Sequence, residues 1–146
     1  GCWRDDGMSD DSSLITTPAT LATSGPMNPL IAAALEEATP LVATRGWQLP
    51  SEPTLREAEL VLQLTHARWP PPTPLVDADG AITFEWDAGE RGWVELRVDG
   101  SGQLSHSAVI EGDDYVRTED LAGPASAGRL PDWAAEVLRR LYLPLQ

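Results

Sequence analysis

Two glutamates and a histidine on neighbouring segments are the residues of this chain that could do acid–base chemistry. Glu85 and Glu95 lie in two short alternating segments, and His106 lies in a third. Two carboxylates held close together push their pKa values apart, so that one can act as an acid and the other as a base. A histidine titrates near neutral pH. A small hydrolase or isomerase that uses His106 or the Glu85 and Glu95 pair is therefore one hypothesis.

The elements that must position these residues are the strands of an antiparallel meander over residues 81–110. Apolar and polar residues alternate in each segment, and glycine-containing turns separate the segments. A slip of one residue would turn every apolar side chain outward, so only one register buries them all. This register pairs Ile82 with Val98, Phe84 with Leu96, Trp86 with Val94, Val98 with Leu104, Leu96 with His106, and Val94 with Ala108.

The same register separates the candidate residues onto two faces. Glu85 and Glu95 oppose each other on the polar face, where we expect Arg97, diagonal to Glu85, to neutralise them. His106 faces the core, as a pH-sensitive or catalytic group or as a core histidine with one hydrogen bond. A solvated strand face balanced by Arg97 is the alternative to a catalytic pair. The separation of His106 from the glutamates argues against a single catalytic site.

Trp93 shares the polar face with the two glutamates. It must be covered by another part of the chain, bound by a partner, or exposed, and exposed aromatics next to arginine are typical of binding hot spots. Our leading hypothesis is a non-enzymatic interaction protein, with an antitoxin-like or immunity-like role as one example. It would bind a protein partner through Trp93, Glu95, Arg97 and Glu85, and through Trp47, which the pattern does not bury either.

The charge of the chain restricts the class of partner. The formal net charge is −13 and the pI is about 4.3. Direct binding to a nucleic-acid backbone or an anionic membrane requires a basic face, so a basic protein is the better expectation. A third hypothesis is a nucleic-acid mimic, which requires carboxylates on one continuous face, whereas many acids of this chain lie in the N-terminal segment and the loops.

No cofactor or metal is expected. Cys2 is the only cysteine, and the acidic residues between 111 and 120 lack the spacing of a calcium-binding loop. No run of eighteen apolar residues predicts a membrane span, so we expect a cytoplasmic protein. A Gly-Cys opening also fits a processed lipoprotein anchored through Cys2. The oligomeric state is not indicated by the sequence.

The remaining segments predict a single α+β domain over residues 28–146, preceded by a disordered acidic, Ser- and Thr-rich tail over residues 1–27. A first helix begins at Asn28 and is discouraged near Pro40, and a second begins near Thr54, which has capping-box spacing with Glu57. A proline-rich spacer leads to three or four strands, the fourth at residues 115–118. A C-terminal helix then packs on the sheet. We expect three tryptophans in the core: Trp69, Trp86 and Trp133.

The layout from Trp47 onward resembles a loose group of uncharacterised small bacterial and phage-associated proteins. In these, a tryptophan turn and a proline precede a helix, and a proline-rich link leads to a strand like residues 80–86 and a second strand that ends in a glycine turn. Gln48 and Leu49 stand where that group has a Gly-rich turn. The resemblance implies a shared layout and carries no functional residues. The matching residues are Trp47, Pro53, Pro74, Gly80, Ile82, Glu85, Trp86 and Gly100.

Overall fold

The computed structural model describes residues 27–121 and 130–142 of the 146-residue chain. The expected disordered tail, apart from its last residue, and the expected lipid site at Cys2 lie outside the described residues. The elements in chain order are α1 (Pro29–Arg45), α2 (Glu52–Thr65), β1 (Thr73–Val76), β2 (Ile82–Asp87), the 3-10 turn η1 (Gly89–Arg91), β3 (Gly92–Val98), β4 (Gln103–Ile110), β5 (Asp113–Asp120) and α3 (Asp132–Tyr142).

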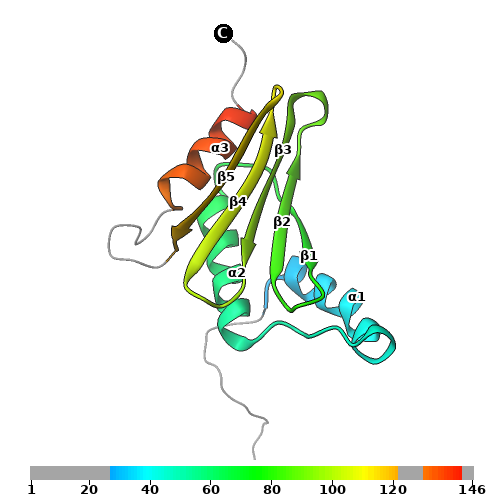
Figure 1. Cartoon of the computed structure of the whole chain (residues 1–146). Coiled ribbons are helices and arrows are strands. Elements are labelled where there is room, and N and C mark those ends of the chain that lie inside the picture. Colours follow the sequence, from blue (N-terminus) through cyan, green and yellow to red (C-terminus); the bar gives the residue numbers. More distant parts are fainter. Residues whose placement is uncertain (1–26, 122–129, 143–146) are drawn as a thin grey trace, which may run out of the picture.

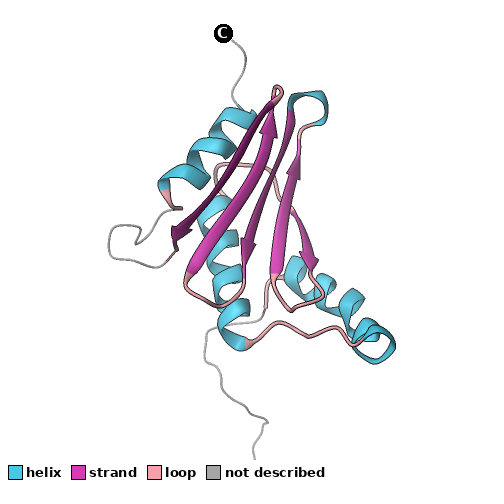
Figure 2. Ribbon diagram, in the orientation of Figure 1, coloured by secondary structure: helices cyan, strands magenta, loops and turns pink. Residues whose placement is uncertain are grey.

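The five strands form one antiparallel meander in the order β1-β2-β3-β4-β5 (Figures 1 and 2). The predicted α+β class is confirmed, with two N-terminal helices before the sheet and one helix after it. All six predicted pairings of core-facing residues are confirmed, as is the direct opposition of Glu85 and Glu95. The alternation of apolar residues was therefore sufficient to fix the register.

One strand more than predicted is present: β1 forms from the segment that was predicted to be a proline-rich spacer. Pro74 lies inside this strand and pairs with Phe84 of β2. Proline cannot donate a backbone hydrogen bond, but it is tolerated at the edge of a sheet, where β1 lies. The expected fourth strand is also longer than residues 115–118, because β5 spans Asp113–Asp120.

The core lies between the helices and one face of the sheet, which we call the inner face. Figure 1 shows α2 behind the middle strands and α3 beside β5. Trp86 is buried as predicted, and its indole Nε1 donates a hydrogen bond to the carbonyl of Pro70 at 2.7 Å. Trp69 is half-buried against the core. The expectation for Trp133 was wrong: it is 46% exposed in the first turn of α3, with the Arg117 guanidinium 4.5 Å from its ring centre.

Both N-terminal helices depart from their expected ends. Asn28 caps α1 as predicted, with its Oδ1 accepting from the N–H of Leu30 at 2.8 Å, but α1 continues through Pro40 to Arg45. Pro40 and Glu36, whose carbonyl the proline leaves without a donor, are both exposed, so water can bind this carbonyl. The cap of α2 is Ser51, whose Oγ accepts from the N–H of Thr54, so Thr54 lies inside the helix.

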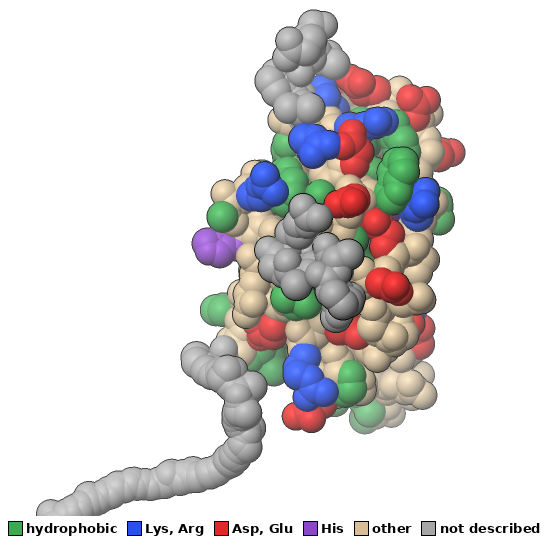
Figure 3. Space-filling view, turned by 90° about the vertical axis from the view of Figure 1, so that its left-hand side faces the viewer, with side chains coloured by type: hydrophobic (Ala, Val, Ile, Leu, Met, Phe, Trp, Pro, Cys, Tyr) green, Lys and Arg blue, Asp and Glu red, His purple; other side chains and the backbone are tan. Residues whose placement is uncertain are grey.

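Three long-range contacts from charged side chains hold the helices on the sheet. Glu57 of α2 accepts from the N–H groups of Gly100 and Gly102, at 2.8 and 2.7 Å, and so fixes the β3–β4 turn. Glu119 of β5 accepts from two N–H groups in the first turn of α3. Arg91 donates twice to the carbonyl of Arg140 at the other end of α3. Figure 3 shows the side of the molecule with α3, where acidic and arginine side chains lie next to one another.

Candidate functional site

The face of the sheet opposite the core is the candidate site, and we call it the outer face. The helices α2 and α3 pack against the inner face, and α1 lies against the edge strand β1 (Figure 1). Side chains alternate between faces along each strand, so the register assigns the outer face without ambiguity. Its residues are Thr73, Leu75, Thr83, Glu85, Asp87, Trp93, Glu95, Arg97, Gln103, Ser105, Ser107, Val109, Asp114, Val116, Thr118 and Asp120.

Trp93 lies near one end of the outer face. It is opposite Asp87 on β2 and Val109 on β4, and it is half-buried. Its neighbours on the face therefore cover part of the ring, and no described helix packs over it. Val116, diagonal to Val109 on β5, is 81% exposed. Trp93, Val109 and Val116 thus form an apolar diagonal from the middle of the sheet to its β5 edge.

The two glutamates lie beside Trp93 on the same face. Glu95 is two residues from Trp93 along β3, and it is directly opposite Glu85 on β2. Burial raises the pKa of Glu95 above its ordinary value, and the charges of Glu85 and Asp77 raise it further. Within the described residues neither glutamate forms an ion pair or accepts a side-chain hydrogen bond. The pair is therefore a like-charge pair without a counter-ion in this part of the chain.

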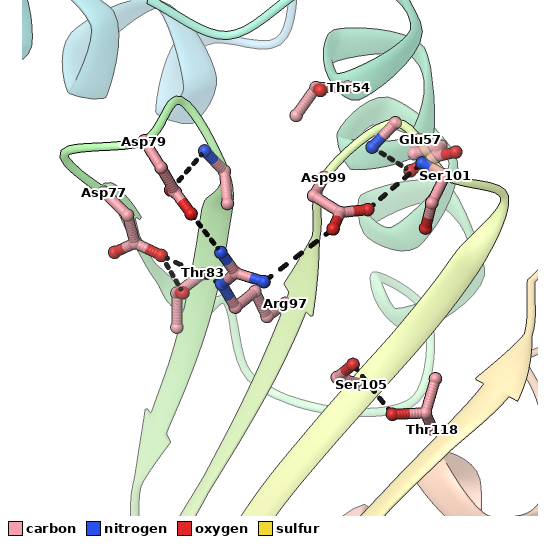
Figure 4. Close-up of polar contacts among 12 residues, drawn as sticks. Thr54, Glu57, Asp77, Asp79, Thr83, Arg97, Asp99, Ser101, Ser105 and Thr118 are labelled. Atoms are coloured by element: carbon pink, nitrogen blue, oxygen red, sulfur yellow. Dashed lines mark hydrogen bonds and ion pairs between the residues drawn. The ribbon is translucent and has the colours of Figure 1, made fainter. Parts of the chain in front are cut away.

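Arg97 does not neutralise the glutamates, so that expectation was wrong. Its guanidinium binds three aspartates instead: Nη2 lies 2.7 Å from Oδ2 of Asp79, Nε lies 3.3 Å from Oδ2 of Asp77, and Nη1 lies 3.9 Å from Oδ2 of Asp99 (Figure 4). Arg97 is opposite Thr83, whose hydroxyl also donates to Asp77. The β1–β2 and β3–β4 turns, which lie at the same end of the sheet, supply the aspartates, and the side chain extends toward them and away from Glu85.

The aspartate cluster around Arg97 is a structural contact between turns. Asp79 also accepts from the N–H of Ala81, which stabilises the β1–β2 turn. A side-chain hydrogen bond with Ser101 holds the pKa of Asp99 below its ordinary value, and the charge of Arg97 lowers it further. Among the described residues, the charge of Arg97 is therefore balanced by aspartates, whereas the glutamate pair has no cation bound to it.

Trp47 is not brought to the outer face. It lies in the link between α1 and α2 and lines a hollow of about 230 Å³ between α1 and β1, together with Leu41 and Pro74. Trp93, in contrast, is the second residue of β3 and lies next to the β2–β3 loop, at the other end of the sheet (Figure 1). Four of the five candidate residues thus share one surface, and the fifth belongs to a separate apolar hollow.

His106 faces the core opposite Leu96, as the register predicts. Its side chain is buried, and its Nδ1 has no hydrogen-bond partner, so the expected single hydrogen bond is not seen at this atom. Burial lowers the pKa of His106 below its ordinary value, and the charge of Glu119 opposes this shift while that of Arg117 adds to it. His106 and the two glutamates lie on opposite faces, so the residues named for a hydrolase or isomerase do not converge.

Sequence reasoning missed the contacts that hold the site's scaffold together. Glu57 was read as half of a capping box, but it reaches 43 residues along the chain to bind a turn. Glu119 belongs to the acidic residues that were considered as calcium ligands, and no pattern marks Arg91, although each satisfies backbone groups at one end of α3. An acid or arginine that can reach a helix end leaves no local pattern, so no signal in the sequence could have identified them.

In residues 27–121 and 130–142 there is no group of three or more His, Cys, Asp or Glu side chains placed to hold a metal ion. No described helix is both long and apolar enough to cross a membrane. No protein-family model, curated protein or solved structure matches this chain.

Proposed function

We propose that this chain is a protein-binding domain whose outer face, around Trp93, Glu95 and Glu85, binds a basic protein partner. The observation that supports this most is the glutamate pair, which lies beside the half-buried Trp93 and forms no ion pair with any residue that the structure describes. Like charges directly opposite each other destabilise a sheet. A cationic side chain of a partner would remove this repulsion on binding, and the relief of the repulsion would add to the binding free energy.

The chemistry of the surface favours an arginine or lysine in that position. Its charged group would lie between Glu85 and Glu95, and its aliphatic stem or guanidinium would lie against the ring of Trp93. A cation over a tryptophan contributes about 0.5–1 kcal/mol at an exposed site. Arginine fits best, because its planar group can bind two carboxylate oxygens and stack on an indole at the same time.

The net charge of −13 supports the same class of partner. An acidic surface raises the local concentration of a basic protein and speeds association, and salt screens this effect over about 8 Å at physiological ionic strength. Association should therefore slow markedly as salt is raised. An antitoxin-like or immunity-like role, in which an acidic domain covers a basic functional surface, is one role of this class.

The experiment compares capture of partner proteins by the immobilised chain and by single variants. Trp93→Ala should lower the affinity for the captured partner about 30-fold, which corresponds to a hot spot of about 2 kcal/mol. Trp133→Ala is the matched control, because Trp133 is also partly exposed but lies in α3. Glu95→Gln should weaken capture, while Glu36→Gln, an exposed acid of α1, should not. If every partner bound by the wild type is held equally by Trp93→Ala, the site assignment is wrong.

A further inference from the structure

The two edges of the sheet differ in how they are closed. The β1 edge has four residues, includes Pro74, and has α1 beside it. The β5 edge has eight residues and no proline, and within the described residues its only strand partner is β4. An edge of this length presents a row of backbone groups that another strand can pair with.

The β4–β5 turn determines which backbone groups of β5 point outward. Glu111 and Gly112 both have positive φ, 53° and 89°, as in a two-residue hairpin turn. The flanking Ile110 and Asp113 then form a hydrogen-bonded pair, and hydrogen-bonded pairs recur at every second residue. Leu121 follows this alternation, because its N–H donates to the carbonyl of Gly102 at 2.9 Å. The backbone groups that face away from β4 belong to Asp114, Val116, Thr118 and Asp120.

We propose that this edge of β5 accepts an extended basic segment of another protein as a sixth strand. The outward-facing residues place Asp114 and Asp120 six residues apart, with the 81% exposed Val116 between them. A cross-strand pair of opposite charge stabilises a sheet, so basic residues six apart on the incoming strand would pair with both aspartates. The backbone supplies affinity, and the aspartate spacing supplies selectivity.

Charge also separates a basic partner from a second copy of this chain. Two copies of β5 paired antiparallel about Arg117 would align their outward backbone groups. This register would place Asp114 of each copy opposite Asp120 of the other. Like charges would then face each other at both ends of the strand pair, which disfavours self-association. Figure 3, which faces the side where β5 lies in Figure 1, shows acidic side chains along the molecule from end to end.

This edge lies two strands away from Trp93, so it goes beyond the proposed function and can be tested separately from it. The probe is a labelled nine-residue peptide with arginine at positions 2 and 8, threonine and valine at positions 4 and 6, and threonine elsewhere. Binding is followed by fluorescence anisotropy. The control peptide carries glutamate at positions 2 and 8, and it should bind at least about tenfold more weakly, because two favourable pairs become unfavourable.

Variants of the edge distinguish backbone pairing from charge attraction alone. Val116→Pro removes one outward N–H and leaves the pairing with β4 intact, so it should weaken binding about tenfold or more. Val116→Thr keeps the N–H and should bind within about threefold of the wild type. The double variant Asp114→Asn, Asp120→Asn keeps the backbone and should weaken binding about tenfold. Trp93→Ala should bind as the wild type does, whether or not Trp93 binds a partner of its own.

Three results would overturn the proposal. The first is an arginine peptide that does not bind, and the second is equal binding of the two peptides. The third is full binding to both Val116→Pro and the double aspartate variant. Sedimentation equilibrium adds one more decisive outcome: a wild-type dimer that Val116→Pro dissociates would assign the edge to a second copy of this chain instead.

Discussion

Removing one member of the Glu85 and Glu95 pair should stabilise the fold. The two residues are directly opposite each other on β2 and β3, and the nearest arginine on the face, Arg97, is bound to three aspartates. A glutamine in either position keeps the shape of the side chain and removes one of the two like charges. We therefore expect Glu85→Gln and Glu95→Gln each to raise the free energy of unfolding at pH 7.

The structure bounds the size of this gain. Cross-strand pairs contribute about 0.2–1 kcal/mol, and both side chains are partly exposed, so screening places the repulsion near 0.5 kcal/mol. For a domain of this size that is about 2 °C in melting temperature. Once one charge is gone the second substitution relieves nothing, so the double variant should gain about 0.5 kcal/mol rather than about 1 kcal/mol.

The pH dependence of stability tests the same prediction independently. Burial and the charges of Glu85 and Asp77 raise the pKa of Glu95 above its ordinary 4.5, so the folded state binds this proton more readily than the unfolded chain. Stability from this group is therefore greatest below pH 4.5 and falls as the pH rises through the folded-state pKa. The gain of Glu95→Gln should be present at pH 7 and absent at pH 3.5.

Urea unfolding of the wild type, the two single variants and the double variant measures these free energies of unfolding. The measurements are made at pH 7 and pH 3.5, in low and in high salt. High salt should shrink the coupling between the two sites. A loss of stability in Glu95→Gln at pH 7 would refute the reasoning, as would strictly additive gains in the double variant. Either result would mean that a cation already balances the pair in the folded protein.

Three further predictions concern the scaffold. Glu57→Ala should cost about 2 kcal/mol of stability, because it leaves the N–H groups of Gly100 and Gly102 without their charged acceptor, and Glu57→Gln should cost less; urea unfolding measures both. Burial lowers the pKa of His106 below 6.5, so the wild type should lose stability as the pH falls below 6.5. His106→Leu should lose less stability than the wild type between pH 7.5 and 5 in thermal melts, and equal losses would contradict the assignment. Gly92→Ala should cost more than about 3 kcal/mol, since φ is 138° and a Cβ would meet the Val109 carbonyl oxygen at 1.9 Å; a variant that melts at the wild-type temperature would show this contact to be wrong.

The sequence predicted the middle of the sheet well, because period-2 alternation constrains register strongly. Ile82 to Trp86 can face the core in one pairing only, and this also fixed the outward positions of Glu85 and Trp93. The same logic placed His106 inside. Where apolar and polar residues alternate along neighbouring strands, the pattern therefore predicts which side chains share a surface.

Other elements were mispredicted where solvent exposure or a contact with a distant residue outweighed a local sequence preference. Pro40 does not end α1, because that part of the helix is exposed, and Pro74 does not exclude β1, because an edge strand tolerates proline. Trp133 fits an apolar stripe but is 46% exposed in the first turn of α3, where its ring contacts the Arg117 guanidinium of β5. The direction of Arg97 depends on aspartates 18 and 20 residues away, which no local pattern reveals.

The central claim is that a protein partner binds on the outer face, and photo-crosslinking tests it most directly. A photoreactive residue replaces Ser107, which is opposite Glu95 on the outer face, and in a second protein it replaces Gln63, an exposed residue of α2. The account predicts a crosslinked partner from position 107, with basic residues next to the crosslink, and none from position 63. A partner that crosslinks from position 63 and not from position 107 would contradict it.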